Sequence, residues 1–164
     1  MEIQVREATE DDASLIAELT RAAWRNTAGA RSSGHQESVA RVIHDLHLGG
    51  GFVLLVDAQC AGSVRWVELE TESGVWEILR MGVLPDWRGH HLSQHLLEAV
   101  VHRAMASGVA ELRLAVPYDR HALFDLYAAL GFETAHELEH SQTTLAPDAP
   151  PEPPAIMMRR QLRR

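Results

Sequence analysis

The sequence contains no lysine, only one cysteine and no long hydrophobic run, and each of these absences excludes a class of protein. Cys60 alone cannot form an intrachain disulfide, and it is too isolated for a cysteine-rich metal site. No apolar run approaches the ~20 residues that a membrane-spanning helix needs, and the first residues lack the pattern of a signal peptide. We therefore expect a cytoplasmic protein with no membrane partner.

The net charge is −8, and all fifteen basic residues are arginines. Proteins that bind nucleic acid normally present a basic face, so this charge argues against a nucleic-acid partner and mildly favours a cationic one. The length of 164 residues and the hydrophobic content of 46% are sufficient for a normal core. Both values predict one domain over residues 1–164.

Two periodicities alternate along the chain and predict an α/β fold. Period-two apolar runs predict strands at residues 3–6, 52–56, 61–69, 75–83, 111–116, 132–138 and 156–162. Helical spacing predicts helices at residues 15–23, 38–48, 92–105 and 120–130. The sequence also predicts a loop at residues 26–34 and a Pro-rich surface loop at about residues 141–154. A crossover helix between two strands makes them parallel, whereas a meander is antiparallel, so the expected sheet is mixed.

The strand expected at residues 75–83 is apolar on both of its faces. Alternate side chains of a strand share a face. One face would hold Val75, Glu77, Leu79, Met81 and Val83, and the other would hold Trp76, Ile78 and Arg80. This pattern predicts a central strand that is covered on both sides.

A strand, a basic turn and a helix follow one another between residues 77 and 93 without spare residues. Pro85 ends the strand because it has no N–H donor, and Leu92 opens the helical pattern. The first turn of a helix offers unpaired N–H groups and the positive end of the helix dipole, and Arg88 and Gly89 stand just before it. This junction predicts a site for a phosphate-sized anion.

The run from Val83 to Ser93 reads Val-Leu-Pro-Asp-Trp-Arg-Gly-His-His-Leu-Ser. It resembles the acyl-CoA pyrophosphate loop of the GNAT family of N-acetyltransferases, which is Arg/Gln-x-x-Gly-x-Gly/Ala after a Val-x-Pro. Residues 119–132 resemble a second motif of that family, the helix Asn-x-x-Ala-x-x-Leu-Tyr-x-x-x-Gly-Phe. Three positions depart from the family pattern: His91 replaces the first loop glycine, Ser93 replaces Gly/Ala, and Asp119 takes the place of Asn.

The resemblance implies a single GNAT-like domain, with a mixed, splayed sheet of about seven strands and helices on both faces. It also implies acetyl-CoA as a co-substrate, with its pyrophosphate at the loop and its pantetheine arm along the backbone of the central strand. The residues that it assigns to this cofactor are Met81, Gly82, Val83, Arg88, Gly89, His90, His91, Leu92, Ser93, Asp119 and Tyr127. Asp119 could instead cap the helix that follows it.

Two residues are candidates for catalysis, and each has an ordinary structural alternative. By the resemblance, Tyr127 would protonate the departing CoA sulfur, whereas a tyrosine on an apolar helix face is by itself more often a core residue. Glu77 would accept the proton of the amine, because an amine of pKa near ~10.4 is almost wholly protonated at pH 7. The alternative for Glu77 is a partner for an arginine. Glu68 and Glu70 are weaker candidates for the base.

Ten histidines raise the question of a metal site. His91 and His95 are four residues apart, and His44 lies near His47, but neither pair has a carboxylate or a thiol at ligand spacing. We therefore expect no metal.

The sequence thus predicts an acetyl-CoA-dependent N-acetyltransferase that moves an acetyl group to a primary amine of a small molecule or peptide by direct attack. A noncatalytic acyl-CoA-binding or regulatory module is the alternative, because His91 and Ser93 change the glycine loop. By the resemblance, a loop bordered by Trp24, Arg25, Arg31 and His35 would cover the acceptor pocket. The sequence leaves open the identity of the acceptor, the choice between Glu77 and an ordered water as base, and whether the chain forms a homodimer.

Overall fold

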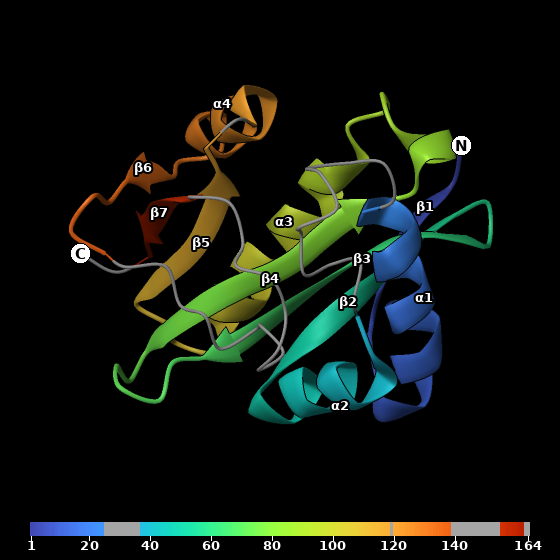
Figure 1. Ribbon diagram of the computed structural model, residues 1–164, viewed down its shortest axis with the longest axis horizontal. Helices are drawn as coiled ribbons and strands as arrows, with labels where there is room; N and C mark the ends of the chain where they lie inside the picture. The colour runs from blue at the N-terminus through green and yellow to red at the C-terminus, as the bar shows by residue number, and fades with distance from the viewer. Residues whose placement is uncertain (25–36, 119, 139–154, 163–164) are drawn as a thin grey trace.

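The computed structural model describes residues 1–24, 37–118, 120–138 and 155–162 (Figure 1). The strands are β1 (Ile3–Glu7), β2 (Gly49–Val56), β3 (Gln59–Glu68), β4 (Val75–Val83), β5 (Glu111–Pro117), β6 (Glu133–Thr134) and β7 (Ala155–Gln161). The helices are α1 (Ala13–Trp24), α2 (Val39–Leu48), α3 (Leu92–Ala106) and α4 (His121–Ala129), with 3-10 turns η1 (Glu10–Asp12) and η3 (Pro85–Trp87). The loops expected at residues 26–34 and 141–154, as well as Asp119, lie outside the described residues.

The strands form one seven-stranded sheet in the order β1-β2-β3-β4-β5-β7-β6. β4 and β5 are parallel, because α3 crosses over between them, and the other neighbouring pairs are antiparallel. The prediction of a mixed α/β sheet with β4 at its centre is confirmed.

Two layers of helices cover the sheet and define two apolar clusters. α1 and α2 lie on one face, where Ile16, Val42 and Val53 belong to a buried cluster that we call the α1/α2-side cluster. α3 lies on the other face (Figure 1), where a larger buried cluster, the α3-side cluster, includes Leu96 and Ile78. Each face of β4 is therefore covered, as the sequence predicted.

The alternation of side chains along β4 is broken at Arg80. The backbone of Arg80 is left-handed, with φ of +53°, and the pairing of β3 with β4 shifts register at this point. Such a bulge turns the following residues to the opposite face. Met81 and Val83 therefore pack with the α3-side cluster, and Arg80 points to the other face, where it approaches Glu37. The prediction that Met81 and Val83 share a face with Glu77 was wrong for this reason.

β4 and β5 pair only where both strands begin. Their register partners are Val75 with Glu111, Trp76 with Leu112, and Glu77 with Arg113. β4 continues to Val83 and β5 continues to Pro117 without further pairing to each other. The two strands thus diverge after Glu77, which confirms the splayed sheet.

Three other features differ from the prediction. β2 begins at Gly49, not at Phe52, because Gly49 and Gly50 pair with β3 so closely that a Cβ on Gly50 would lie 2.5 Å from the ring of Trp66. β6 holds only two residues, because the chain turns at Ala135, whose carbonyl accepts from the N–H of Leu138. Met105 of α3 is 56% exposed and does not join the apolar stripe of that helix.

Asp12 ties the start of α1 to β1. Its carboxylate accepts two hydrogen bonds of 2.9 Å from the guanidinium of Arg6 and one of 2.8 Å from the N–H of Thr9. The bonds from Arg6 are the main cause that lowers the pKa of Asp12 from 3.8 to about 2. Because this pKa is lowered on folding, the stabilisation is present above pH 3.8 and is lost as the pH falls through 2.

We expect Asp12→Asn to lower the free energy of unfolding at pH 7 by about 1 kcal/mol, since the ion pair is partly exposed. The difference from the unchanged protein should shrink at pH 3, where part of the carboxylate is protonated in the unfolded chain. Urea denaturation at both pH values measures this difference in the free energy of unfolding, and Asp11→Asn is the control at an exposed position. A difference that does not change with pH would contradict this linkage.

Among the described residues, no helix is both long enough and apolar enough to cross a membrane.

Candidate active site

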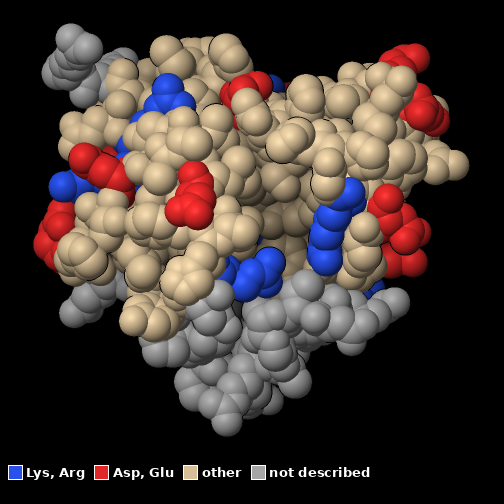
Figure 2. Space-filling view, turned by 90° about the horizontal axis from the view of Figure 1, so that it is seen from above, with Lys and Arg blue, Asp and Glu red and all other residues tan. Residues whose placement is uncertain are grey.

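The site elements converge at the end of the sheet where β4 and β5 diverge. β4 ends there at Val83, α3 starts there at Leu92, and α4 follows the end of β5. Figure 2 looks onto this end of the molecule and shows a hollow in its surface with basic side chains along the edge. This is the junction at which the sequence predicted an anion site.

The turn before α3 holds two residues in the left-handed conformation. Gly89 has φ of +88°, and a Cβ placed on it would meet no atom within 4 Å, so the space beside its backbone is open. His91 has φ of +57° and ψ of +28° and is the N-cap residue of α3. The chain thus keeps a glycine-like backbone at the motif position where it has histidine, although this conformation costs about 1–2 kcal/mol for a residue with a Cβ.

The first turn of α3 presents its backbone, not its side chains, to this space. Leu92 is buried in the α3-side cluster, so its side chain fixes the helix on the sheet. His90 and His91 are exposed, and Ser93 is half-buried. The N–H groups of the first turn have no intrahelical acceptor and are the donors that could hold an anion.

Arg88 fastens the end of β4 to the end of α1. Its guanidinium donates to the carbonyl oxygen of Val83 at 3.2 Å and to that of Ala23 at 2.6 Å. The carbonyl of Ala23 lies at the C-terminal end of α1, where the helix dipole favours a cation. Gly82 lets the end of α1 pack closely on β4, because a Cβ on Gly82 would lie 2.5 Å from the ring of Trp24. Arg88 thus holds the end of α1 beside the loop, and this structural role does not depend on whether its charge also attracts an anion.

We expect His91→Gly to raise the free energy of unfolding by about 1 kcal/mol, because glycine adopts the left-handed conformation without the steric cost of a Cβ. His90→Gly is the matched control, since His90 does not have a positive φ, and it should lower the stability slightly. Urea denaturation of the three proteins tests this. A less stable His91→Gly protein would show that contacts of the imidazole outweigh the strain.

Tyr127 lies on α4 and is only 7% exposed, within the α3-side cluster. Its ring packs edge to face against Phe132, with the ring centroids 5.9 Å apart. Burial raises the pKa of the Tyr127 phenol above its ordinary value of 10. The hydroxyl is therefore protonated at neutral pH and can donate a hydrogen bond or a proton.

The register of the second motif is one residue later than the resemblance first suggested. Counted back from Tyr127, the spacing Asn-x-x-Ala-x-x-Leu-Tyr reaches Arg120, not Asp119. α4 begins at His121, and Arg120 is its N-cap residue. The side chain of Arg120 makes no capping hydrogen bond, and Asp119 lies outside the described residues.

Glu77 is 2% exposed and lies at the last paired position before β4 and β5 diverge. It stands beside Val67 of β3 and Arg113 of β5 in the sheet, on the face of β4 that α1 and α2 cover. Arg113 itself is bonded to Glu72 and Glu111. Tyr127 belongs to the cluster on the opposite face, so the two candidate residues approach the sheet from different sides.

The other two carboxylates proposed for the base do not share this position. Glu68 pairs with Trp76 in the sheet, so it faces the α3 side, and it is exposed. Glu70 lies beyond the end of β3 and is exposed too. Glu77 therefore remains the candidate base.

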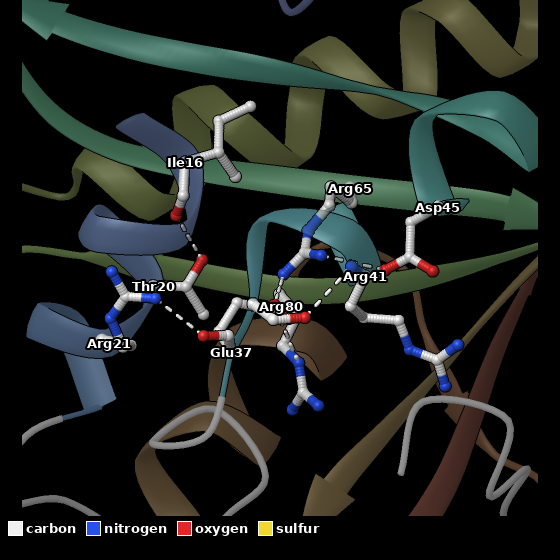
Figure 3. Close-up of polar contacts among 9 residues, drawn as sticks. Ile16, Thr20, Arg21, Glu37, Arg41, Asp45, Arg65 and Arg80 are labelled. Atoms are coloured by element: carbon white, nitrogen blue, oxygen red, sulfur yellow. Dashed lines mark hydrogen bonds and ion pairs between the residues drawn. The ribbon is translucent and has the colours of Figure 1, made fainter. Parts of the chain in front are cut away.

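A buried cluster of charged residues, which the sequence analysis missed, lies on the same face as Glu77 (Figure 3). Arg65 is fully buried in β3 and is bonded to Glu37 and, at 2.9 Å, to Asp45 of α2. Arg21 of α1 donates to the carbonyl of Glu37 at 2.7 Å, and Arg80 approaches the Glu37 carboxylate. Burial raises the pKa of Asp45, because desolvation outweighs the attraction of Arg65. One sequence signal was available, because Arg65 stands between the apolar residues Val64 and Trp66 of β3.

Within the described ranges, no group of three or more His, Cys, Asp or Glu side chains could hold a metal ion. His47 is bonded to Glu10 at 3.2 Å, on the molecular surface.

Of the four residues expected to border the acceptor loop, only Trp24 is among the described residues.

The fold is that of the GNAT acetyltransferases. The model of the Acetyltransferase (GNAT) family matches residues 15–132, and the chain belongs to this family. A comparison with curated protein sequences finds no match.

Solved structures with the same fold span nearly the whole chain. The PaiA N-acetyltransferase from Thermoplasma acidophilum, in complex with coenzyme A, is 17% identical, with a TM-score of 0.76 and coverage of 98% of this chain and 99% of that one. The ribosomal-protein-S18-alanine N-acetyltransferase from Escherichia coli is 19% identical, with a TM-score of 0.77 and coverage of 99% and 96%. YncA from Salmonella typhimurium, with its cofactor acetyl-CoA, is 18% identical, with a TM-score of 0.75 and coverage of 100% and 96%.

Proposed function

We propose that this protein is an acetyl-CoA-dependent N-acetyltransferase that transfers the acetyl group to a primary amine by direct attack of the amine. The observation that carries the proposal is the divergence of β4 and β5 after the buried Glu77, along the stretch of β4 that leads to the open turn before α3. Membership of the GNAT family supports the reaction class. Fold alone does not identify an acceptor.

The residues of the turn fit the pyrophosphate of coenzyme A. The open space beside Gly89 leaves room for a phosphate, and the backbone N–H groups from His90 to Ser93 at the start of α3 supply donors and a favourable dipole. We assign the pantetheine arm to the backbone edge of β4 at Met81 to Val83, since β4 has no partner in β5 along this stretch. When bound, the cofactor supplies a thioester carbonyl that an amine can attack.

Two protons must move for this transfer to proceed, one away from the amine and one to the sulfur. Glu77 is the group that we assign to the first, directly or through a water, because it is a carboxylate on the face of β4 that holds the acceptor side. Tyr127 is assigned to the departing sulfur, because its buried hydroxyl stays protonated and can donate a hydrogen bond or its proton to that sulfur. Their placement on opposite faces of the sheet matches these opposite roles.

The alternative of a noncatalytic acyl-CoA-binding module rested on the loss of a glycine at His91. The left-handed backbone of His91 weakens that argument, since the turn keeps the shape that the glycine would give.

Two measurements separate these functions. Acetyl-CoA at about 100 times its Kd should stabilise the protein by about 2.7 kcal/mol, which is visible as a rise in Tm. A thiol-release assay with a panel of amines should then show turnover that depends on the amine. Binding without thiol release would favour the noncatalytic module, and the absence of binding would contradict both functions.

A further inference from the structure

The helix α4 carries Arg120 and Tyr127 on the side that packs on the body of the protein. Arg120 is the N-cap residue of α4, and its carbonyl oxygen accepts from the N–H of Phe124 at 3.2 Å, which closes the first turn. Tyr127 follows about two helical turns later, so both residues lie along one side of the helix. Leu123 and Phe124, on the same side, pack against the α3-side cluster, whereas Asp125 is exposed.

The charge of Arg120 acts on the hydroxyl of Tyr127. A helical side chain leans toward the N-terminus of its helix, which brings this hydroxyl toward Arg120. Burial raises the pKa of the Tyr127 phenol, and the charge of Arg120 opposes that rise. Two other charged residues near α4 are placed elsewhere, because Asp125 is exposed and Arg160 donates to the carbonyl of Leu130, beyond the far end of the helix, at 3.0 Å. The guanidinium of Arg120 does not cap the helix, since its side chain makes no capping hydrogen bond.

The proposed transfer places negative charge on the sulfur of coenzyme A. The amine nitrogen forms a bond to the acetyl carbon, the bond from that carbon to sulfur breaks, and its electron pair goes to the sulfur, while the amine proton goes to the base. A thiol has an ordinary pKa of about 8.5, whereas the phenol pKa is raised above 10, so proton transfer from Tyr127 to the departing sulfur is uphill. Tyr127 can share its proton in a hydrogen bond, and the sulfur takes up a proton afterwards. A cation beside the sulfur would stabilise the charge in the meantime.

We propose that Arg120 is a further catalytic residue of this transfer, whose guanidinium stabilises the departing thiolate of coenzyme A beside the hydroxyl of Tyr127. An arginine remains charged throughout the working pH range, and its planar group offers several N–H donors. α4 follows the end of β5, at the end of the sheet where β4 and β5 diverge (Figure 1). This inference rests on the proposed N-acetyltransferase activity and adds a residue to its site.

The affinities of coenzyme A and of desulfo-coenzyme A, which lacks the sulfur, test the proposal without any turnover. A cation beside the sulfur lowers the pKa of the bound thiol below its ordinary value of about 8.5. The affinity gained in this way is present above pH 8.5 and is lost as the pH falls through the pKa of the bound thiol. For a pKa lowered by one unit, the Kd of desulfo-coenzyme A divided by the Kd of coenzyme A should rise about eightfold from pH 6.5 to pH 9.5. Groups that titrate elsewhere in the site act on both ligands and cancel in this ratio.

The variant Arg120→Gln assigns the effect to one residue. Calorimetric titration should show that the rise of the ratio falls to less than about threefold in Arg120→Gln, whereas Arg120→Lys, which keeps the charge, retains most of it. Arg103→Gln is the matched control, since Arg103 lies on α3 and pairs with Glu7, and it should leave the rise unchanged. In the thiol-release assay, Arg120→Gln should lower kcat about tenfold while the KM of the amine changes less than about threefold.

The outcomes that contradict the proposal do not depend on one variant. A ratio that stays constant with pH in the unchanged protein would overturn it and leave the N-acetyltransferase activity standing. A folded Arg120→Gln protein, as judged by Tm, that binds both ligands more weakly by the same factor at both pH values would show that Arg120 holds α4 or another part of coenzyme A. A normal rise of the ratio without thiol release on any amine would instead overturn the proposed function.

Discussion

Replacing Tyr127 with phenylalanine is expected to lower kcat by roughly 10²-fold while the Kd of acetyl-CoA stays within about twofold. Phenylalanine keeps the ring that packs against Phe132 and removes only the hydroxyl. The loss should therefore fall on the step in which the sulfur departs. Steady-state kinetics for kcat and calorimetry for Kd separate the two effects.

The pH dependence of this effect follows from the burial of the phenol. Since burial raises the pKa of Tyr127 above its ordinary value of 10, the hydroxyl remains protonated across the working range. A thiol has an ordinary pKa of about 8.5, so Tyr127 would act chiefly by donating a hydrogen bond to the developing thiolate. Below about pH 9.5, the activity of the unchanged protein should therefore not decrease with rising pH unless the activity of the Tyr127→Phe variant decreases in the same way.

The chain offers a matched control for this substitution. It has only two tyrosines, and Tyr118 is 68% exposed at the end of β5. Tyr118→Phe removes the same hydroxyl without touching the core, so it should leave kcat unchanged. An unchanged kcat in Tyr127→Phe would return Tyr127 to a purely structural role.

The parts of this structure that the sequence could predict are those governed by local chemistry. The bounds of β4 follow from an alternating run that ends before Pro85, and the interaction of Asp12 with Thr9 follows from residue types at capping spacing. The position of the turn between β4 and α3 follows from a strand pattern, Pro85 and a helical pattern in direct succession. Each of these features depends on residues that lie close together in the sequence.

The parts that the sequence could not predict depend on distant residues. No local pattern marks the bulge at Arg80, because arginine has no preference for a left-handed backbone, and the change of face is evident only from the pairing with β3. The contacts of Arg65 join residues 20 and 28 positions away, so periodicity cannot show them. The bulge decides which side chain lies beside Glu77 on the face of β4 that α1 and α2 cover.

Replacing Glu77 with glutamine should lower the rate by about 10² to 10³-fold at pH 7, and the deficit should narrow as the pH rises. An amine with pKa near 10.4 is neutral in about one molecule in two thousand at pH 7 and in about one in ten at pH 9.4. At the higher pH the amine arrives without its proton, so a base is needed less. The direction of the pH effect therefore follows from the ionisation of the amine. The rate of the Glu77→Gln variant should rise more steeply with pH than the rate of the unchanged protein.

Glutamine has nearly the shape of glutamate, so a folded Glu77→Gln protein tests the proton transfer and not the packing of β4. The exposed Glu68, on the opposite face of the sheet, supplies the control Glu68→Gln, which should follow the pH profile of the unchanged protein. Rates measured from pH 6.5 to 9.5 with one saturating amine are sufficient. A deficit of the same size at every pH would mean that Glu77 holds the acceptor or the strand in place, and an ordered water would then become the better candidate for the base.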